Sequence, residues 1–447
     1  MSAITGPRRL AAALVVGAMG AVLVPSFAVA QVASSKPYGR VSFNVDTTGR
    51  TTEGLPARRD SEISTSLTFV MPDADTGGAE FGVDLRQARR FPADRPSRLS
   101  IYDGYAGVHS GGATQLRVRG GHMWLQDMGT VGALAGILGE VRHGTLGEGT
   151  RLRAGFFAGL EPLVYETGYA PGIRKEGGYF AFERGYLQRH TVGFARVRQG
   201  GLTERSLLTF SNFIPAGKRF FAYQAAEFDI KGPANGTAGG GLSYFLANVR
   251  VSPTDRVEIL GTYNRGRALD ARGLTEDLLK GRPLTTQAIE GLRYESRGAR
   301  LTVEVVKNVR IYGGIATDRN NRDDDPTARV TVGGHAGNVF GSGFDLSASD
   351  ARINRPNAPF HSRYLSVGRA LGRAVYLSVD YSTSLSVVRF QRSDGLVIET
   401  RPWTRQFTIN GSAMLNRYLS LLVTVDDEAD DTSTGLRLFS GLSYRIQ

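Results

Sequence analysis

The stretch LGRAVYLSVDYSTSLSVVRF, residues 371–390, decides the fold class. Apolar and polar side chains alternate along it with a period of two, which is typical of a β-strand with one apolar and one polar face. The apolar face carries Val375, Leu377, Val379, Tyr381, Leu385 and Val387, and the other face carries Ser378, Asp380, Ser382, Ser384 and Ser386. The alternation runs well beyond the roughly 5–6 residues that are usual for strands in soluble proteins. Such a strand suits an environment that is apolar on one side and wet on the other.

The composition excludes a bundle of membrane helices. The chain has 447 residues, of which 57 are glycine and 41% are hydrophobic, and its mean hydropathy is −0.19. Beyond residue 30, no apolar run approaches the roughly 18 residues that a helical span needs. The sequence contains no cysteine, so lipoprotein anchoring, disulfide bonds and thiol chemistry are excluded.

The first 30 residues have the pattern of a signal peptide. Arg8 and Arg9 precede the apolar run LAAALVVGAMGAVLV, and the small-residue site Ala28-Val29-Ala30 follows it. We therefore predict a signal peptide at residues 1–30, a short periplasmic segment at 31–37 and a barrel at 38–447. The expected location is the cell outer membrane.

The same alternation recurs in EISTSLTFVM (62–71), AEFGVDLRQ (79–87) and RQFTINGSAML (405–415). A strand that crosses a membrane in a tilted orientation needs roughly 9–11 residues. Short turns and longer polar connections also alternate back from the C-terminus. The sequence therefore predicts an all-β fold, a transmembrane antiparallel up-and-down β-barrel. We expect about 20–22 strands, with 18 kept open, because residues 177–197 form either one hairpin or one bent strand.

The last segment, GLRLFSGLSYRIQ (435–447), places Leu436, Leu438, Leu442, Tyr444 and Ile446 on one face. It resembles the terminal strand of Gram-negative outer-membrane β-barrel proteins of the porin kind, although Gln447 stands where those proteins usually carry an aromatic residue. The resemblance implies contact with outer-membrane lipid and lipopolysaccharide, and with the outer-membrane assembly machinery. No single family is matched by a motif, and the oligomeric state stays open.

The first strand is expected at about Tyr38, which leaves no room for an N-terminal plug. Because barrels of this size usually have a filled lumen, another segment is expected to occupy part of it. The candidates are residues 267–291, whose TEDLLKG core favours a helix, and residues 161–178. The alternative for residues 267–291 is a loop that lies over the outer rim.

Charge carries most of the functional information. The formal net charge of +12 falls to +10 without Arg8 and Arg9. A lipid-facing arginine costs roughly 2–4 kcal/mol at the membrane midplane, so arginines that alternate with apolar residues should face the lumen. These pore-lining candidates are Arg117, Arg119, Arg151, Arg153, Arg196 and Arg198. Unpaired, they would attract anions; paired with lumen acids such as Asp84, Asp380 and Glu80, they would only stiffen the wall.

Catalytic and metal-binding patterns are nearly absent. The six histidines are scattered without metal-ligand spacing, so we expect no enzyme activity, no cofactor and no nucleic-acid partner. Two acidic runs are weak candidates for divalent cations that bridge to lipopolysaccharide phosphates, with solvated loop charge as the alternative. They contain Asp323, Asp324 and Asp325, and Asp427, Asp430 and Asp431.

Three functions remain open from the sequence. The first is passive diffusion of small hydrophilic solutes, with a preference for anions if the arginines are unpaired. The second is secretion or substrate-specific uptake with periplasmic partners, and the third is a structural, surface-binding barrel.

Overall fold

The computed structural model describes residues 37–71, 77–92, 96–129, 131–144, 149–163, 167–185, 188–232, 241–323, 325–355, 358–391 and 396–446. The predicted signal peptide, most of the segment 31–37, Asp324 and Gln447 lie outside these ranges. None of the helices in the described ranges has the length and apolarity needed to span a membrane.

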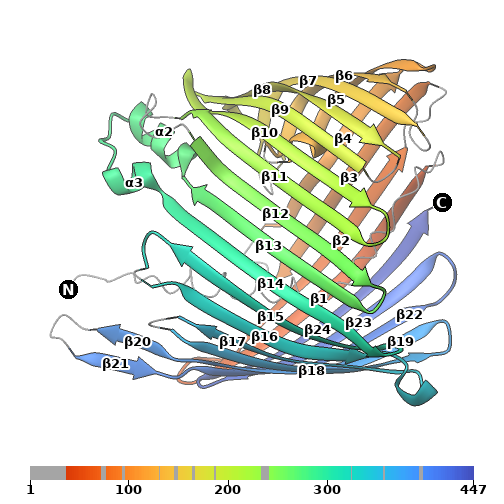
Figure 1. The fold of residues 1–447 in the computed structure, drawn as a ribbon, viewed down its shortest axis with the longest axis vertical. Helices are drawn as coiled ribbons and strands as arrows, with labels where there is room; N and C mark the ends of the chain where they lie inside the picture. Colours follow the sequence, from red (N-terminus) through yellow and green to blue (C-terminus); the bar gives the residue numbers. More distant parts are fainter. Residues whose placement is uncertain are drawn as a thin grey trace.

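Twenty-two strands of the described chain form one closed antiparallel sheet (Figure 1). Each strand pairs with the next along the chain, and the last pairs with the first. The first half comprises β1 (Tyr38–Thr52), β2 (Arg58–Met71), β3 (Gly78–Phe91), β4 (Arg98–His109), β5 (Thr114–Trp124), β6 (Ala133–His143), β7 (Thr150–Pro162), β8 (Tyr169–Arg184), β9 (Gln188–Gln199), β10 (Leu202–Ala216) and β11 (Phe220–Lys231). The second half comprises β12 (Gly241–Thr254), β13 (Val257–Ala268), β14 (Leu292–Val306), β15 (Val309–Asn320), β16 (Thr327–Ala336), β17 (Phe344–Asn354), β18 (Phe360–Leu371), β19 (Val375–Ser386), β22 (Trp403–Met414), β23 (Leu419–Asp430) and β24 (Ser433–Ile446).

The closing register keeps the apolar face continuous. Residues directly opposite each other in adjacent strands lie on the same face of a sheet. Between β1 and β24, Val41 is opposite Tyr444 and Phe43 is opposite Leu442. Period-two alternation in every strand therefore gives the barrel one apolar and one polar surface.

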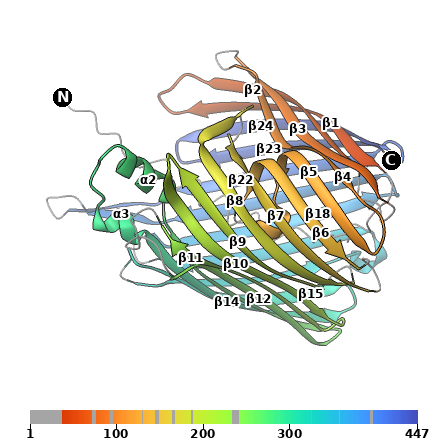
Figure 2. The same cartoon turned by 90° about the horizontal axis from the view of Figure 1, so that it is seen from above.

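The connections differ at the two ends of the barrel. At the end that we call the long-loop end lie α2 (Ala271–Leu279), α3 (Thr286–Glu290) and the separate hairpin of β20 (Val388–Gln391) and β21 (Val397–Thr400), as Figures 1 and 2 show. The turn with η2 (Val339–Gly341) and the ends of β1 and β24 that carry the termini lie at the opposite, short-turn end. In outer-membrane barrels, short turns face the periplasm and longer loops face outward.

The barrel prediction is confirmed, and the strand number, expected at about 20–22 with 18 kept open, is 22 in the described chain. Residues 177–197 belong to a hairpin of β8 and β9. The polar run at 426–435 is not one of the longer connections, because β23 continues to Asp430 and β24 begins at Ser433. The Asp430 carboxylate accepts hydrogen bonds from the backbone N–H groups of Thr432 and Ser433, which closes a tight turn. Most of the candidate plug at 161–178 is β8.

A segment between β5 and β6 folds inward and carries η1 (Gln126–Met128). Met128 is buried, and a Cβ at Gly193 of β9 would collide with its Sδ atom. Lys175 Nζ of β8 donates to the carbonyl oxygens of Val131 (2.7 Å) and Ala133 (3.1 Å) and holds the segment in place. The buried apolar cluster of this wall contains Met123, Leu125, Met128, Val131, Leu134, Leu138, Phe157, Tyr179, Ala181, Ala195 and Leu207.

Candidate functional site: the charged wall of the lumen

The two faces of β5 show which side of the sheet meets lipid. Leu116 and Val118 are exposed on one face, whereas Arg117 and Arg119 point to the other. Leu116 is 61% exposed and Arg117 only 6%. Among β-structures, only closed barrels satisfy every backbone group inside a bilayer, and outer-membrane barrels carry an apolar band outside and polar residues within. The chain is an outer-membrane β-barrel.

The first node of the lumen wall is Glu80 on β3. Both oxygens of its buried carboxylate accept hydrogen bonds from Arg117 and from Arg119 of β5. The Arg119 bonds measure 2.9 Å and 2.7 Å, and the Arg119 guanidinium lies 4.5 Å from the centre of the Tyr105 ring. One carboxylate thus holds two arginines in fork geometry, the arrangement that favours arginine over lysine.

The second node is Arg153 on β7, which is buried against three acids. Its guanidinium donates to Asp127 of η1 at 2.9 Å and 2.7 Å, to Glu140 of β6 at 3.1 Å and to Glu183 of β8 at 2.8 Å. Tyr179 donates its hydroxyl to Glu140. The inward segment therefore supplies an acid that sequence reasoning did not assign to the lumen.

Other arginines of this wall are paired as well. The pairs are Arg151 with Glu183 (2.8 Å), Arg142 with Glu140, and Arg189 with Asp127. Together these side chains line a recess of about 250 Å³. Of the six predicted pore-lining arginines, the structure brings Arg117, Arg119, Arg151 and Arg153 together, and each of the four forms an ion pair. The acids are shared: with Arg142 and Arg189, six guanidinium groups share the carboxylates of Glu80, Asp127, Glu140 and Glu183.

The inward prediction is corrected for Arg196 and Arg198 on β9. They lie on the same face as the exposed Val192, whereas the alternate face, with Gly193 and Ala195, packs on the inward segment. In its second half the inner face of β9 is apolar because it packs on the buried cluster around η1, whereas Arg189 near the start of the strand points inward to Asp127. The usual rule that places the polar face inside therefore fails only in this second half of the strand.

The two predicted lumen aspartates accept hydrogen bonds from uncharged groups. Asp84 of β3 accepts from the Thr68 hydroxyl at 3.4 Å. Asp380 of β19 accepts from Tyr364 at 2.9 Å and from Asn410 Nδ2 at 2.8 Å. Around Asp380 the lumen wall of β18, β19 and β22 carries hydroxyl and amide groups. This part of the wall therefore offers uncharged hydrogen-bonding groups, unlike the charged wall of β5–β8.

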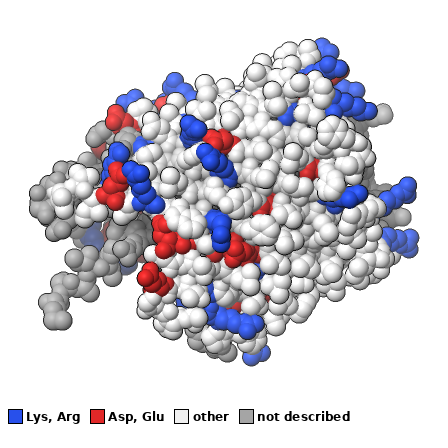
Figure 3. Space-filling view, turned by 90° about the horizontal axis from the view of Figure 1, so that it is seen from below, with Lys and Arg blue, Asp and Glu red and all other residues white. Residues whose placement is uncertain are grey.

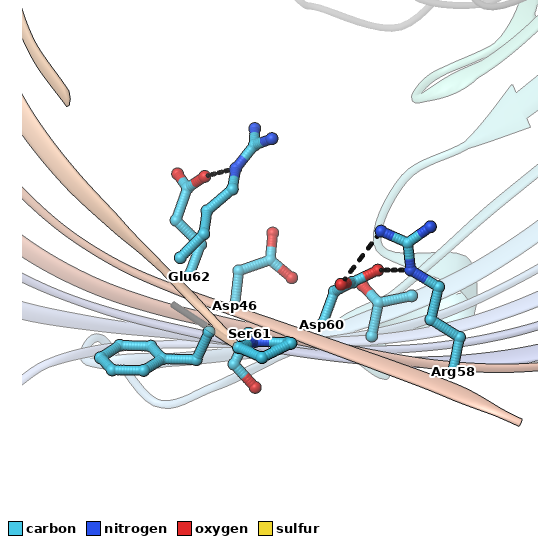
Figure 4. A pocket seen from close by; sticks show the side chains of 9 residues that line it. Asp46, Arg58, Asp60, Ser61 and Glu62 are labelled. Carbon is cyan, nitrogen blue, oxygen red and sulfur yellow. Dashed lines mark hydrogen bonds and ion pairs between the residues drawn. The ribbon is translucent and has the colours of Figure 1, made fainter. Parts of the chain in front are cut away.

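A second charged cluster lines β1, β2 and β3 (Figure 4). Glu62 accepts from Arg90 at 2.8 Å, and Arg58 pairs with Asp60 at 2.7 Å. Figure 4 shows Glu62, Asp60 and Asp46 on one side of the strands and Ser61 on the other, as alternation requires. These side chains are far more exposed than those around Glu80.

The acidic runs do not form a metal site within the described residues. Asp323 accepts from Asn320 at 2.6 Å, and Asp324 lies outside the described ranges. Asp427 and Asp430 face opposite sides of β23, and Asp431 accepts from the Trp403 backbone at 3.2 Å.

Comparison with known families and with curated proteins finds no match. Among solved structures, the chain is similar to Pseudomonas aeruginosa OccK10 (OpdN), with 13% identity over 92% of this chain and 99% of that chain and a TM-score of 0.41. It is similar to Acinetobacter baumannii OccAB2, with 10% identity over 92% and 98% and a TM-score of 0.44. It is also similar to the P pilus usher (PapC) translocation pore, with 11% identity over 91% and 100% and a TM-score of 0.45. With similarity this low, the function proposed below rests on this chain's own geometry.

Proposed function

We propose that this barrel is an outer-membrane channel for the passive diffusion of small hydrophilic solutes. The observation that carries the proposal is the exposure of side chains that face inward. Arg86 and Arg90 of β3 point into the barrel, Arg86 well inside the strand, yet their side chains are 44% and 56% exposed. An inward side chain is exposed only where solvent occupies the lumen, so a wet passage along β1–β3 accounts for these values.

The width of the barrel leaves room for a passage. Barrels of 16–18 strands already leave an aqueous channel, whereas 22-stranded transporters have a plugged lumen, so an open passage depends on how much of the lumen the inward segments fill. The inward segment with η1 packs against the wall of β5–β10, and the buried apolar cluster lies on that wall. Helix α2 stays at the mouth, where Arg272 binds Glu204 of β10 and Glu161 of β7, both at 2.9 Å. Residues 267–291 therefore narrow one part of the entrance.

The polar character of the walls indicates the class of solute. Charged pairs line β1–β3 and β5–β8, and hydroxyl and amide groups line the inner face of β18, β19 and β22. Such walls replace the hydrogen bonds that a hydrophilic solute makes with water. Because each arginine of β5 and β7 is held in an ion pair, although some pairs share one acid, we propose at most a weak preference for anions. Assembly of the barrel by the outer-membrane machinery, inferred from the terminal strand, stays a prediction.

Single-channel recording in planar bilayers tests this function. The folded barrel should conduct, and replacing residues 125–132 with an Asn-Gly turn should increase the conductance because it removes the inward segment. Replacing residues 388–400 with the same turn provides a control, because β20 and β21 form a separate sheet beyond the barrel strands. A folded barrel that does not conduct would rule out the channel.

A further inference from the structure

The outer surface of β13, β14 and β15 carries an arginine cluster near the long-loop end. It consists of Arg265, Arg293, Arg297 and Arg319 around Glu295. Arg265 lies opposite Glu295, and Glu295 lies opposite Arg319, so these three residues form one row across the three strands. Side chains opposite each other in such a row have Cβ atoms about 4.5–5.5 Å apart. Arg293 and Arg297 lie two positions away on the same face of β14.

The cluster lies at the edge of the lipid-facing band. On the same face, the next row toward the short-turn end holds Ala299 and Ile315, and Leu301 follows. Ile315 is 66% exposed, which marks surface that only lipid would cover in the membrane. An arginine is costly at the membrane midplane but inexpensive near the interface. The cluster is therefore placed at the depth of the lipid headgroups.

The cluster has an excess of positive charge. Glu295 is the single acid in it, and it accepts from Arg297 at 2.8 Å and 2.5 Å and from the Tyr263 hydroxyl at 3.1 Å. Within the described ranges, no acid lies within ion-pair distance of Arg265, Arg293 or Arg319, and Glu295 interacts electrostatically with Arg265 without a direct ion pair. Three exposed guanidinium groups thus retain unused donors on the outside of the barrel, where a solute in the lumen does not reach them.

A similar arrangement occurs twice more on the outer surface. On β8 and β9, Glu176 lies 3.6 Å from Arg196 and 4.0 Å from Arg198. On β17 and β18, Asp350 binds Arg352, His361 and Arg363 at 3.3, 2.7 and 3.4 Å. Figure 3 shows a broad uncharged area on one outer face, with charged side chains gathered toward its left, the long-loop side, and along its right margin. Basic clusters thus recur near the outward end.

We propose that the arginine cluster of β13–β15 binds the phosphate groups of the phosphorylated glycolipid of the outer leaflet. The guanidinium fork matches phosphate oxygens two at a time, and charge-assisted hydrogen bonds of this kind are the strong ones. The long-loop end faces outward in such barrels, so the cluster meets the leaflet that carries these phosphates. In the same way, Arg196 and Arg198 on the outer surface would bind lipid phosphate groups and would not line the lumen.

The test measures binding of bisphosphorylated lipid A to the detergent-purified barrel by native mass spectrometry. The variant Arg265→Gln/Arg293→Gln/Arg319→Gln removes the three arginines that lack an ion pair. We expect its affinity for lipid A to fall roughly tenfold or more, because each lost fork removes a charge-assisted contact. The control variant Arg58→Gln/Arg86→Gln/Arg90→Gln removes the same charge from the lumen face and should bind lipid A like the wild type. Heat-modifiable migration on gels confirms that each variant is folded.

Two further ligands distinguish the source of the phosphate. Fully dephosphorylated lipid A should bind the wild type as weakly as bisphosphorylated lipid A binds the triple variant. Equal binding of the two lipids to the wild type, or unchanged lipid A binding in the triple variant, would overturn the proposal. Displacement of lipid A by inorganic phosphate at an equal concentration would overturn it too, because the cluster would then recognise free phosphate and not the glycolipid. None of these outcomes depends on whether the barrel conducts.

Discussion

Substitution of Glu80 by glutamine tests whether the ion pairs around Glu80 form a buried charge network or behave like ordinary surface ion pairs. The carboxylate is fully buried and forms ion pairs with both Arg117 and Arg119. Glu80→Gln keeps the shape of the side chain. Its amide oxygen alone cannot accept the hydrogen bonds of both guanidinium groups, and its NH₂ group, a donor, faces the N–H donors of Arg117 and Arg119. Arg117 then retains a distant contact with Glu140 at 3.7 Å. Breaking a buried pair by removal of one partner typically costs about 3–5 kcal/mol, so we expect a destabilisation of about that size.

Glu62 offers a matched control because it also binds two arginines. Arg86 and Arg90 reach it at 2.7 Å and 2.8 Å, but their side chains are largely exposed to the lumen. Exposed ion pairs are worth roughly 0–1 kcal/mol, so Glu62→Gln should have little effect. The two substitutions remove the same chemical group from the inner face of neighbouring strands.

The assay is reversible unfolding of the barrel in detergent with urea, followed by the gel shift between folded and unfolded forms. Glu80→Gln should lower the free energy of unfolding several times more than Glu62→Gln. Adding Arg119→Gln to Glu80→Gln should recover part of the loss, because one buried unpaired charge is removed. Equal effects of the two glutamate substitutions, or no recovery in the double variant, would refute the reasoning from burial.

The remaining predictions concern selectivity, packing and pH. Reversal potentials in a KCl gradient should shift toward anion preference in Glu80→Gln. The shift should fade as the salt concentration rises to about 0.1 M, where the screening length is about 10 Å. No shift at low salt would show that the Glu80 node lies outside the path of the ions. Gly193→Leu should destabilise the barrel by about 1–3 kcal/mol through overpacking against η1, and an unchanged urea midpoint would contradict that packing. Hydrogen bonds from Arg401 and Arg389 lower the pKa of Glu399 in the β21 strand. The ion pairs of Glu399 with Arg389 and Arg401 are fully present above the usual glutamate pKa and are lost as the pH falls through the lowered pKa of Glu399. Hydrogen exchange should therefore show the β20–β21 hairpin still protected at about pH 4.3, the usual glutamate pKa. Loss of protection above that pH would refute these ion pairs.

The sequence by itself, through its period-two alternation, determined the fold class of this protein and the direction of many side chains. Ile63, Leu67 and Phe69 face lipid as their spacing predicts, and Leu377 and Val379 do the same on β19. The reason is local: a strand has two faces, and a membrane barrel gives each face a different solvent. Strand length, the closed barrel and the inward direction of the arginines on β5 and β7 all follow from that rule.

Only the tertiary structure decided which acids meet which arginines. Arg117 and Glu80 are 37 positions apart in the chain, and Arg153 meets Asp127 through a segment that sequence patterns did not assign to the lumen. The same segment decides the second half of β9, because the apolar cluster inside the barrel takes small and apolar residues inward and leaves Arg196 outside. Alternation in the sequence shows that the two faces of a strand differ in polarity. Which face points into the lumen depends on the residues that fill the lumen, and contacts between residues far apart in the sequence place those residues there.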